Sequence, residues 1–428
     1  MNFSLERSFA EQQDRADPLA KLREEFRLPT RADGTQQVYL CGHSLGLQPK
    51  AVASILQEEL ESWARRAVDG HFESNRPWLS YHERFATPLA RLVGAQPLEV
   101  VAMNTLTVNL HLMLTTFYRP TRERSKILIE KHAFGSDRYA VASQVRLHGF
   151  DPDVAMLEIG PRSGEEAVRN EDVLSLIERE GAQIATVMLP AVQFLNGQRF
   201  DLRAITQAAQ RAGCRVGFDL AHAIGNVPLE LHDSGADFAV WCHYKYLNAG
   251  PGAVGGAFVH ERHARDFELL RLAGWWGHDK ASRFQMPHEF QPLPGAEGWQ
   301  ISNLPILAAA PLLASLPLFD QAGMPALRAK SVRLTGYLES LLRAQLADAV
   351  TILTPADPEA RGCQLSLRLR RTPSEAHKVF DALAAAGVTG DWREPDVIRV
   401  APVPLYNTYA EAWEFAATLG RCLGRLLR

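Results

Sequence analysis

The chain has 428 residues, of which 46% are hydrophobic and 22% charged, and its formal net charge is -3 at pH 7. This length exceeds what one ordinary hydrophobic core needs, so two domains are expected. A near-neutral charge without long runs of like sign gives no reason to expect a nucleic-acid partner. The five cysteines are scattered and form no C-x-x-C pair, which favours a reducing compartment and argues against a structural metal site.

Residues 1–26 alternate charged and apolar positions at helical spacing and lack the continuous apolar region of a signal peptide. No later segment is long and apolar enough to predict a membrane span. The sequence therefore predicts a cytoplasmic protein that has no membrane partner.

Residues 100–259 alternate short β-branched runs with segments of helical period. Strands are predicted for EVVAM, KILIE, IATVMLP, RVGFDL, FAVWC and GAFVH, and helices for VNLHLMLTTF and LRAITQAAQRAG. This alternation predicts an α/β domain around a mainly parallel sheet.

A different pattern follows residue 305. Long helices are predicted for ILAAAPLLASLPLF and PALRAKSVRLTGYLESLLRAQL, then a half-exposed strand for QLSLRLR. The segment SEAHKVFDALAAAG predicts a helix ending at glycine, VIRVAPV a strand, and the chain closes on a helix from about residue 410. These elements predict a smaller α+β domain.

Polar and aromatic residues follow four of the predicted strands, at the strand ends where α/β proteins bind ligands. They are Thr105 and Thr107 after EVVAM, Phe134, Ser136 and Asp137 after KILIE, Asp219 and His222 in FDLAH, and Lys245 after FAVWC. We expect these side chains to meet at one edge of the sheet.

Lys245 stands between two tyrosines, and a lysine shielded by aromatic rings loses hydration as an ammonium, which favours a nucleophilic neutral amine. Pyridoxal phosphate is the aldehyde that best suits the other strand ends. Asp219 would pair with its ring nitrogen, Phe134 would stack on the ring, and Thr107 with the following helix amides would hold the phosphate. Taken singly, each residue also has an ordinary interpretation as a loop lysine, strand-end cap, core aromatic or helix N-cap.

Long strings of the chain resemble the kynureninase family, which belongs to the fold-type I pyridoxal phosphate enzymes of the aspartate aminotransferase superfamily. The resemblance runs from about residue 39 to residue 409. The strings that carry it are GHSLGLQPK, GHFESNRPW, LTVNLH, AFGSDRYA, FDLAHAIGNVPLELHDSGADFAVWCHYKYLNAGPG, GWWGH, ISNLPI and IRVAPVPLYNT.

This resemblance implies a role for individual residues. Lys245 would be the Schiff-base lysine, Asp219 the pyridinium partner and Arg399 the residue that binds the substrate carboxylate. Tyr244 would either transfer a proton at the substrate carbonyl or bind the phosphate, and both remain open. The implied cofactor positions are Leu106, Thr107, Phe134, Gly135, Ser136, Asp137, Asp219, His222, Tyr244 and Lys245, with Trp275 and Asn303 from a second subunit, and the implied substrate positions are Ser44, His71, Asn303 and Arg399.

The implied fold is a large mainly parallel-sheet domain with a smaller α+β domain, divided as an N-terminal segment 1–65, a cofactor-binding domain 66–305 and a small domain 306–428. The segment 1–65 is expected to cover the active site and to contribute to the small domain. The implied assembly is a homodimer with active sites at the interface. Two departures from the family pattern stand out: His43 replaces the usual asparagine of G-N-S-L-G, and Gly135 replaces a common proline.

The implied reaction is hydrolytic cleavage between Cβ and Cγ of L-kynurenine or its 3-hydroxy form, which gives L-alanine and an anthranilate. Such an activity serves tryptophan breakdown or the supply of nicotinamide precursors. Polar residues at the aryl end, His71 and Asn303, favour 3-hydroxykynurenine, because a buried polar site penalises a substrate without the matching hydroxyl.

Several sequence features bear on other classes of function. Gly250, Gly252 and Gly255 form a literal G-x-G-x-x-G, but a strand rather than a helix is predicted to follow, which disfavours a nicotinamide-dependent dehydrogenase. A desulfurase would need a cysteine on a mobile loop, and none is evident. A transaminase is a further alternative within the same fold class, whereas Lys245, Asp219 and Arg399 together argue against a non-catalytic scaffold. HERH at residues 260–263 lacks the spacing of a zinc protease.

Overall fold

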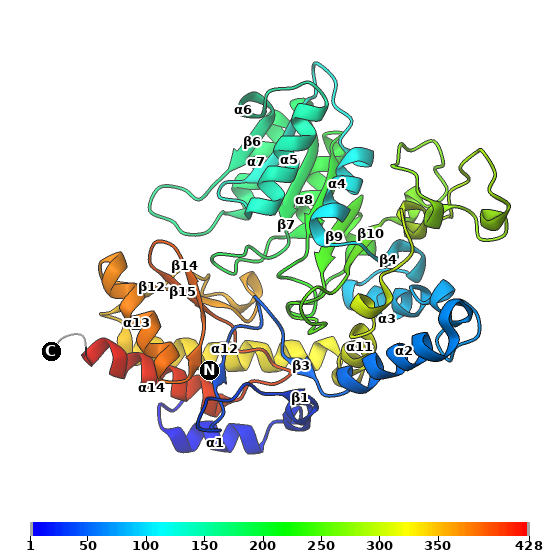
Figure 1. Cartoon of the computed structure of the whole chain (residues 1–428). Coiled ribbons are helices and arrows are strands. Elements are labelled where there is room, and N and C mark those ends of the chain that lie inside the picture. The colour runs from blue at the N-terminus through cyan, green and yellow to red at the C-terminus, as the bar shows by residue number, and fades with distance from the viewer. Residues whose placement is uncertain (1–2, 426–428) are drawn as a thin grey trace.

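The computed structural model describes residues 3–425 and contains two main sheets, each with its own hydrophobic core. Figure 1 shows the larger sheet with its covering helices on one side of the molecule and the smaller sheet beside the long helix α12 (Met324–Leu346) on the other. The two sheets correspond to the α/β and α+β patterns of the sequence.

The larger sheet has seven strands in the order β4-β10-β9-β8-β7-β5-β6. The pairs from β9 to β6 are parallel, whereas β10 runs antiparallel to both β4 and β9. The expected mainly parallel sheet is confirmed, with β6 as an edge strand that the sequence analysis missed. The strands are β4 (Val100–Met103), β5 (Lys126–Glu130), β6 (Met156–Ile159), β7 (Ile184–Pro190), β8 (Arg215–Asp219), β9 (Phe238–Cys242) and β10 (Gly255–Val259).

Helices cover both faces of this sheet, so its central strands are buried throughout. Side chains alternate between the two faces: Val101 and Met103 join the core under α4 (Leu106–Phe117) and α5 (Gly135–Leu147), whereas Val100 and Ala102 join the opposite core. That opposite core includes apolar residues of α3 (Glu83–Val93), α7 (Asn170–Glu180) and α8 (Leu202–Arg211). Burial on both faces explains why these strands read as continuous apolar runs.

The smaller sheet has the order β11-β12-β15-β14 and is antiparallel throughout. Its strands are β11 (Val350–Ile352), β12 (Leu365–Leu369), β14 (Asp391–Arg393) and β15 (Val397–Val400), and it packs with α12, α13 (Pro373–Ala385) and α14 (Tyr409–Arg425). The prediction that β12 is half-exposed was wrong, because Leu365 and Leu367 enter the core while the Ser366 hydroxyl donates to the Leu195 carbonyl on the other face (2.5 Å).

The N-terminal segment belongs with the smaller sheet in space. Helix α1 (Arg7–Arg15) lies beside α14, as Figure 1 shows, and strand β2 (Val38–Tyr39) pairs in parallel with β13 (Val388–Thr389). The N-terminal part of the chain also contains β1 (Phe26–Arg27), β3 (Gln48–Pro49) and α2 (Val52–Arg66). Two short helices, α6 (Pro152–Ala155) and α9 (Leu231–Ser234), lie between strands of the larger sheet.

The helix predicted over residues 306–319 is broken in the structure. It forms α10 (Ile306–Ala309) and α11 (Leu312–Ala322), with Pro311 at the break. A proline has no backbone N–H and its ring clashes with the preceding turn, which accounts for the interruption. Within residues 3–425 no single helix is both long and apolar enough to cross a membrane; residues 306–346 pass that test only as a helix pair bent by 81°.

Candidate active site

One cavity opens at the carboxyl ends of β5, β7, β8 and β9. It receives the first residues of α4 and α5, the last residues of the strands, and the segment that follows β9. The strand ends named from the sequence therefore meet at a single place. The lining residues are Leu106, Thr107, Glu130, Phe134, Ser136, Asp137, Pro190, Val192, Phe194, Asp219, Ala221, His222, Tyr244 and Lys245.

Lys245 projects among aromatic and imidazole rings in this cavity. Its Nζ lies 3.1 Å from His222 Nε2, 5.7 Å from the centroid of the Phe134 ring and 5.9 Å from that of Tyr244. Phe134 in turn packs edge-on against Phe194 at 5.2 Å between centroids. The amine is therefore close to an imidazole nitrogen that can exchange a proton with it, and the surrounding rings limit its hydration.

Three buried carboxyl groups gather at the sheet end of the cavity. Asp219 Oδ1 accepts a hydrogen bond from Ala221 N (2.6 Å), and the Asp137 carboxyl is hydrogen-bonded to that of Asp219. Burial and the Asp219 charge raise the pKa of Asp137 well above its ordinary value, and burial raises the pKa of Glu130 to about 8. Burial raises the pKa of Asp219 as well, but the hydrogen bond from Asp137 lowers it. Like charges this close do not both ionise, so these directions favour Asp137 as the protonated member of the pair.

The start of α4 also borders the cavity, through Leu106 and Thr107. The first intrahelical bond after Thr105 runs from Asn109 N to Thr105 O, so the N–H groups of Leu106 and Thr107 are not used by the helix itself. Gly255 lets β10 approach this point, since a Cβ there would lie 3.0 Å from Leu106 N. Free amides and the helix dipole make this end suitable for an anion.

Arg399 lies in β15 of the smaller sheet and is almost completely buried. Its Nε and Nη2 both donate to the Asp391 carboxylate, the first at 2.6 Å, and its Nη1 donates to the Phe194 carbonyl at 2.5 Å. Phe194 also lines the lysine cavity. The arginine therefore stands next to the cavity, on the side of the smaller sheet.

The other predicted site residues lie outside the lining of this cavity. Gly135 begins α5 next to Phe134, and Ser44 is half-buried in a turn at residues 41–46. His71 packs edge-on against Trp78 (5.3 Å between centroids), Trp275 is 44% exposed and Asn303 is exposed. Their assigned roles stay predictions.

Sequence analysis missed several residues that border the site. Glu130 and Pro190 end strands β5 and β7, so the same strand-end argument would have found them. Phe194 and Asp391 have no such signal. A turn distant in the chain brings Phe194 to Arg399, and the antiparallel pairing of β14 with β15 sets Asp391 opposite Arg399. Only the folded chain reveals their position.

The glycine pattern after Lys245 does not form a dinucleotide site. Gly255 begins strand β10, whereas that fingerprint requires a helix. Gly250 and Gly252 have φ of 82° and 74°, and a Cβ at either would meet open space. Glycine is therefore favoured at these two positions by the positive φ of the backbone, and not by the close approach of another group.

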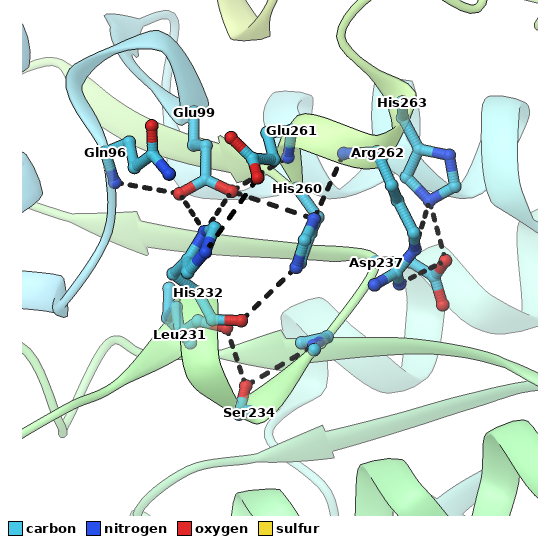
Figure 2. A network of polar contacts seen from close by, with 12 residues as sticks. Gln96, Glu99, Leu231, His232, Ser234, Asp237, His260, Glu261, Arg262 and His263 are labelled. Atoms are coloured by element: carbon cyan, nitrogen blue, oxygen red, sulfur yellow. Dashed lines mark hydrogen bonds and ion pairs between the residues drawn. The ribbon is translucent and has the colours of Figure 1, made fainter.

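A second polar cluster lies away from this cavity (Figure 2). Glu99 Oε1 accepts hydrogen bonds from His232 Nδ1 (3.0 Å) and Glu261 N (2.8 Å), and His260 Nδ1 accepts one from Arg262 N (3.1 Å). The polar atoms that face one another are thus engaged in hydrogen bonds within the protein. This cluster is a satisfied structural network around a buried carboxylate.

Solved structures share the whole fold at low sequence identity. A cysteine desulfurase from Thermococcus onnurineus is 14% identical with a TM-score of 0.73, over 91% of this chain and 95% of that one. A cysteine desulfurase from Escherichia coli is 16% identical with a TM-score of 0.75, over 96% and 98%. At this identity the match shows the α/β fold alone, in agreement with the fold class expected from the sequence.

Sequence comparison separates the families that share this fold. Residues 327–419 match the model of the kynureninase C-terminal domain. The chain is 59% identical to a kynureninase of Myxococcus xanthus and 56% identical to one of Xanthomonas campestris pv. campestris, over 96% of each chain in both comparisons. It is 55% identical to a kynureninase of Stenotrophomonas maltophilia, over 97% of this chain and 98% of the relative. The chain belongs to the kynureninase family.

Proposed function

We propose that this protein hydrolyses the Cβ–Cγ bond of L-kynurenine or 3-hydroxy-L-kynurenine, releasing L-alanine and anthranilate or 3-hydroxyanthranilate. The supporting observation is the cavity that holds Lys245 against His222 at one wall and the Asp137–Asp219 pair at another, with Arg399 next to it. Relatives at 55–59% identity over almost the whole chain carry the kynureninase name. A desulfurase or transaminase has no comparable support.

The residues of the cavity fit pyridoxal phosphate. The buried atoms Asp137 Oδ1 and His222 Nδ1 have no hydrogen-bond partner among residues 3–425, which is the condition expected where a polar ligand supplies one. Asp219 would hold the ring nitrogen, Phe134 would stack on the ring, and Leu106 and Thr107 would hold the phosphate. When bound, this cofactor withdraws electrons from the substrate Cα, which lowers the barrier to removing its proton.

Lys245 would bind the cofactor aldehyde and then act as the base at the substrate Cα, since a lysine released by the substrate amine stays within reach of it. His222 Nε2 at 3.1 Å would accept or return the lysine proton. Asp219 would keep the ring nitrogen protonated while Asp137 donates to Asp219. Gly135, Ser136 and Asp137 would hold the ring edge at the start of α5.

Tyr244 has two proposed roles, proton transfer at the substrate carbonyl and binding of the phosphate. Burial and the Cys242 thiol raise the pKa of Tyr244 above its ordinary value. A hydroxyl with a raised pKa donates hydrogen bonds but releases its proton less readily. The raised pKa therefore favours the phosphate-binding role, in which the hydroxyl donates a hydrogen bond, over proton transfer at the substrate carbonyl.

The aryl end of the substrate would meet residues from a second subunit. We propose a homodimer in which Trp275 and Asn303 reach the partner's cavity, supported by the exposure of both residues and by a loop at residues 265–292 that projects from the body in Figure 1. Ser44, His71 and Asn303 would then line the substrate, with a preference for the 3-hydroxy form. The division 1–65, 66–305 and 306–428 is proposed from the two sheets, whose strands lie within residues 100–259 and 350–400, while the core of the large sheet also includes apolar residues of α11 and of residues 401–406. Burial of all five cysteines is consistent with action in the cytoplasm.

Two measurements test the proposed function. Purified protein with pyridoxal phosphate should release anthranilate from L-kynurenine and 3-hydroxyanthranilate from 3-hydroxy-L-kynurenine, with the higher kcat/KM for the second. A higher value for L-kynurenine would refute the preference, and release of neither would refute the function. Borohydride reduction should fix the cofactor on the peptide that contains Lys245, and a label elsewhere would overturn that assignment.

A further inference from the structure

The turn at residues 41–46 connects the two halves of the site. Ala401 N donates to the Leu40 carbonyl at 2.8 Å, so the start of the turn lies against the end of β15, the strand of Arg399. Gly46 N donates to the Tyr244 carbonyl, also at 2.8 Å, so its end lies against the lysine segment. A Cβ on Gly46 would lie 2.3 Å from the Lys245 carbonyl oxygen, which shows how close this approach is.

His43 lies in the middle of this turn and is completely buried. Neither of its ring nitrogens has a hydrogen-bond partner among residues 3–425. Its Nε2 is 3.9 Å from Asp391 Oδ2, and its ring centroid is 6.3 Å from that of His222, which contacts Lys245. Burying an imidazole without hydrogen-bond partners destabilises the folded state. The position of His43 between these groups therefore points to a ligand that pairs with its ring.

The carboxylate subsite at Arg399 has few free donors. Asp391 Oδ2 takes both Nε and Nη2 of Arg399 and also accepts from Arg393 Nε at 2.9 Å, while Phe194 O takes Nη1. Two guanidinium groups and one carboxylate leave a net positive charge that attracts an anion. Three of the five N–H donors of Arg399 are therefore taken, and a substrate carboxylate, which has two oxygens and several lone pairs, can accept from a further donor besides the remaining two.

We propose that His43 supplies the missing donor, a neutral ring N–H to the α-carboxylate of the substrate, and so completes the subsite begun by Arg399. This inference rests on the proposed function. Burial lowers the pKa of His43 to about 4, so the ring is neutral at physiological pH and presents one N–H. The asparagine that the family pattern has at this position also presents an N–H, from its side-chain amide.

The test compares ligands that differ only in the carboxylate. L-kynurenine and kynuramine, which is L-kynurenine with hydrogen in place of its carboxylate, are titrated into the cofactor-bound protein and followed by the visible absorption of the cofactor, with rapid mixing for the substrate. For His43→Leu we expect L-kynurenine to bind at least about fivefold more weakly and kynuramine to change less than about twofold, because only the first loses a charge-assisted hydrogen bond. His43→Asn should stay within about threefold of the wild type for both ligands.

Each other outcome has a defined meaning. Equal weakening of both ligands in His43→Leu, or no weakening of either, would overturn the inference, as would a His43→Asn variant as defective as His43→Leu. If His43→Leu does not yield folded protein, His43→Ala is judged by the same criterion. Failure of the wild-type protein to bind L-kynurenine would instead overturn the proposed function.

Discussion

At the scale of residues, burial shifts the pKa values of the polar groups in the cavity and so decides which of them carry a proton. Asp137 and Asp219 share one proton, and Lys245 shares a contact with the neutral His222. Burial and the neighbouring Lys245 charge lower the pKa of His222 well below its ordinary value, so its ring nitrogen is available to accept from the amine. Burial and neighbouring charges therefore set the proton distribution of Asp137, Asp219 and His222 in the proposed site.

The proton assignment in the acid pair predicts unequal effects of two isosteric changes. Asp219→Asn should lower kcat at least about a hundredfold, because a neutral amide cannot hold a positive charge on the cofactor ring. Asp137→Asn should lower kcat less than about tenfold, because an amide resembles the protonated carboxyl that it replaces. Steady-state kinetics of both holoenzymes measures the contrast. An Asp137→Asn variant as impaired as Asp219→Asn would show that the proton is placed on the wrong residue.

The position of Arg399 predicts that its removal weakens substrate binding and leaves the cofactor bound. For Arg399→Ala we expect the KM for L-kynurenine to rise at least about tenfold, since charge-assisted hydrogen bonds contribute about 1.5–3 kcal/mol each. The absorption spectrum of bound cofactor should change little. Arg393→Ala, which removes the other guanidinium on Asp391, serves as the control and should raise KM less. Loss of cofactor in Arg399→Ala would mean that the residue has another role.

At the scale of elements, a polar network links the residue before β4 to the residues that follow β10, in addition to the packing of the sheet. Figure 2 shows Glu99, which precedes β4, hydrogen-bonded to His232. His232 lies in helix α9, which belongs to the connection between β8 and β9. The Glu99 hydrogen bond raises the pKa of His232 above its ordinary value. A histidine of this kind stabilises the fold fully below its unfolded pKa of about 6.5, and that contribution is lost as pH rises through the folded-state pKa.

This linkage predicts a pH-dependent effect of one substitution. His232→Gln should lower the Tm near pH 6 and should lower it less near pH 9, where the histidine is neutral in both states. Thermal unfolding of wild type and variant at both pH values measures the difference. His377→Gln is the matched control, since His377 and Asp381 form an exposed pair at 3.2 Å, and surface pairs contribute about 0–1 kcal/mol. An equal loss of Tm at both pH values would contradict the linkage.

At the scale of the whole molecule, the proposed site is shared between parts that are distant in sequence. The large sheet supplies Lys245 and the acid pair, the small sheet supplies Arg399, and the turn at residues 41–46 joins them. The exposed Trp275 and Asn303 stand apart from this cavity. In the proposed homodimer they complete the cavity of the other subunit.

A shared site predicts complementation between two inactive variants. Lys245→Ala and Trp275→Ala should each lack most activity as homodimers. After mixing under conditions that exchange subunits, about half of the dimers are hybrids with one intact site each, so about one quarter of wild-type activity should return. The assay is anthranilate release, with each variant exchanged against itself as the control. No recovery despite proven subunit exchange would contradict a role of Trp275 across the interface.

The sequence by itself determined the α/β pattern followed by an α+β pattern, the family, and the residues at the strand ends, because local periodicity and strand-end chemistry depend on neighbours in the chain. It did not reveal the edge strand β6 or the burial of β12, since both depend on what packs against the strand. The shared proton of Asp137 and Asp219, the Asp391 fork on Arg399 and the unpartnered ring of His43 were decided only by the tertiary structure. Asp137 and Asp219, and His43 and the groups around it, come from segments far apart in the chain, whereas Asp391 meets Arg399 through the pairing of β14 with β15. All three arrangements depend on burial and charge pairing that exist only once the two sheets and the N-terminal turn are assembled.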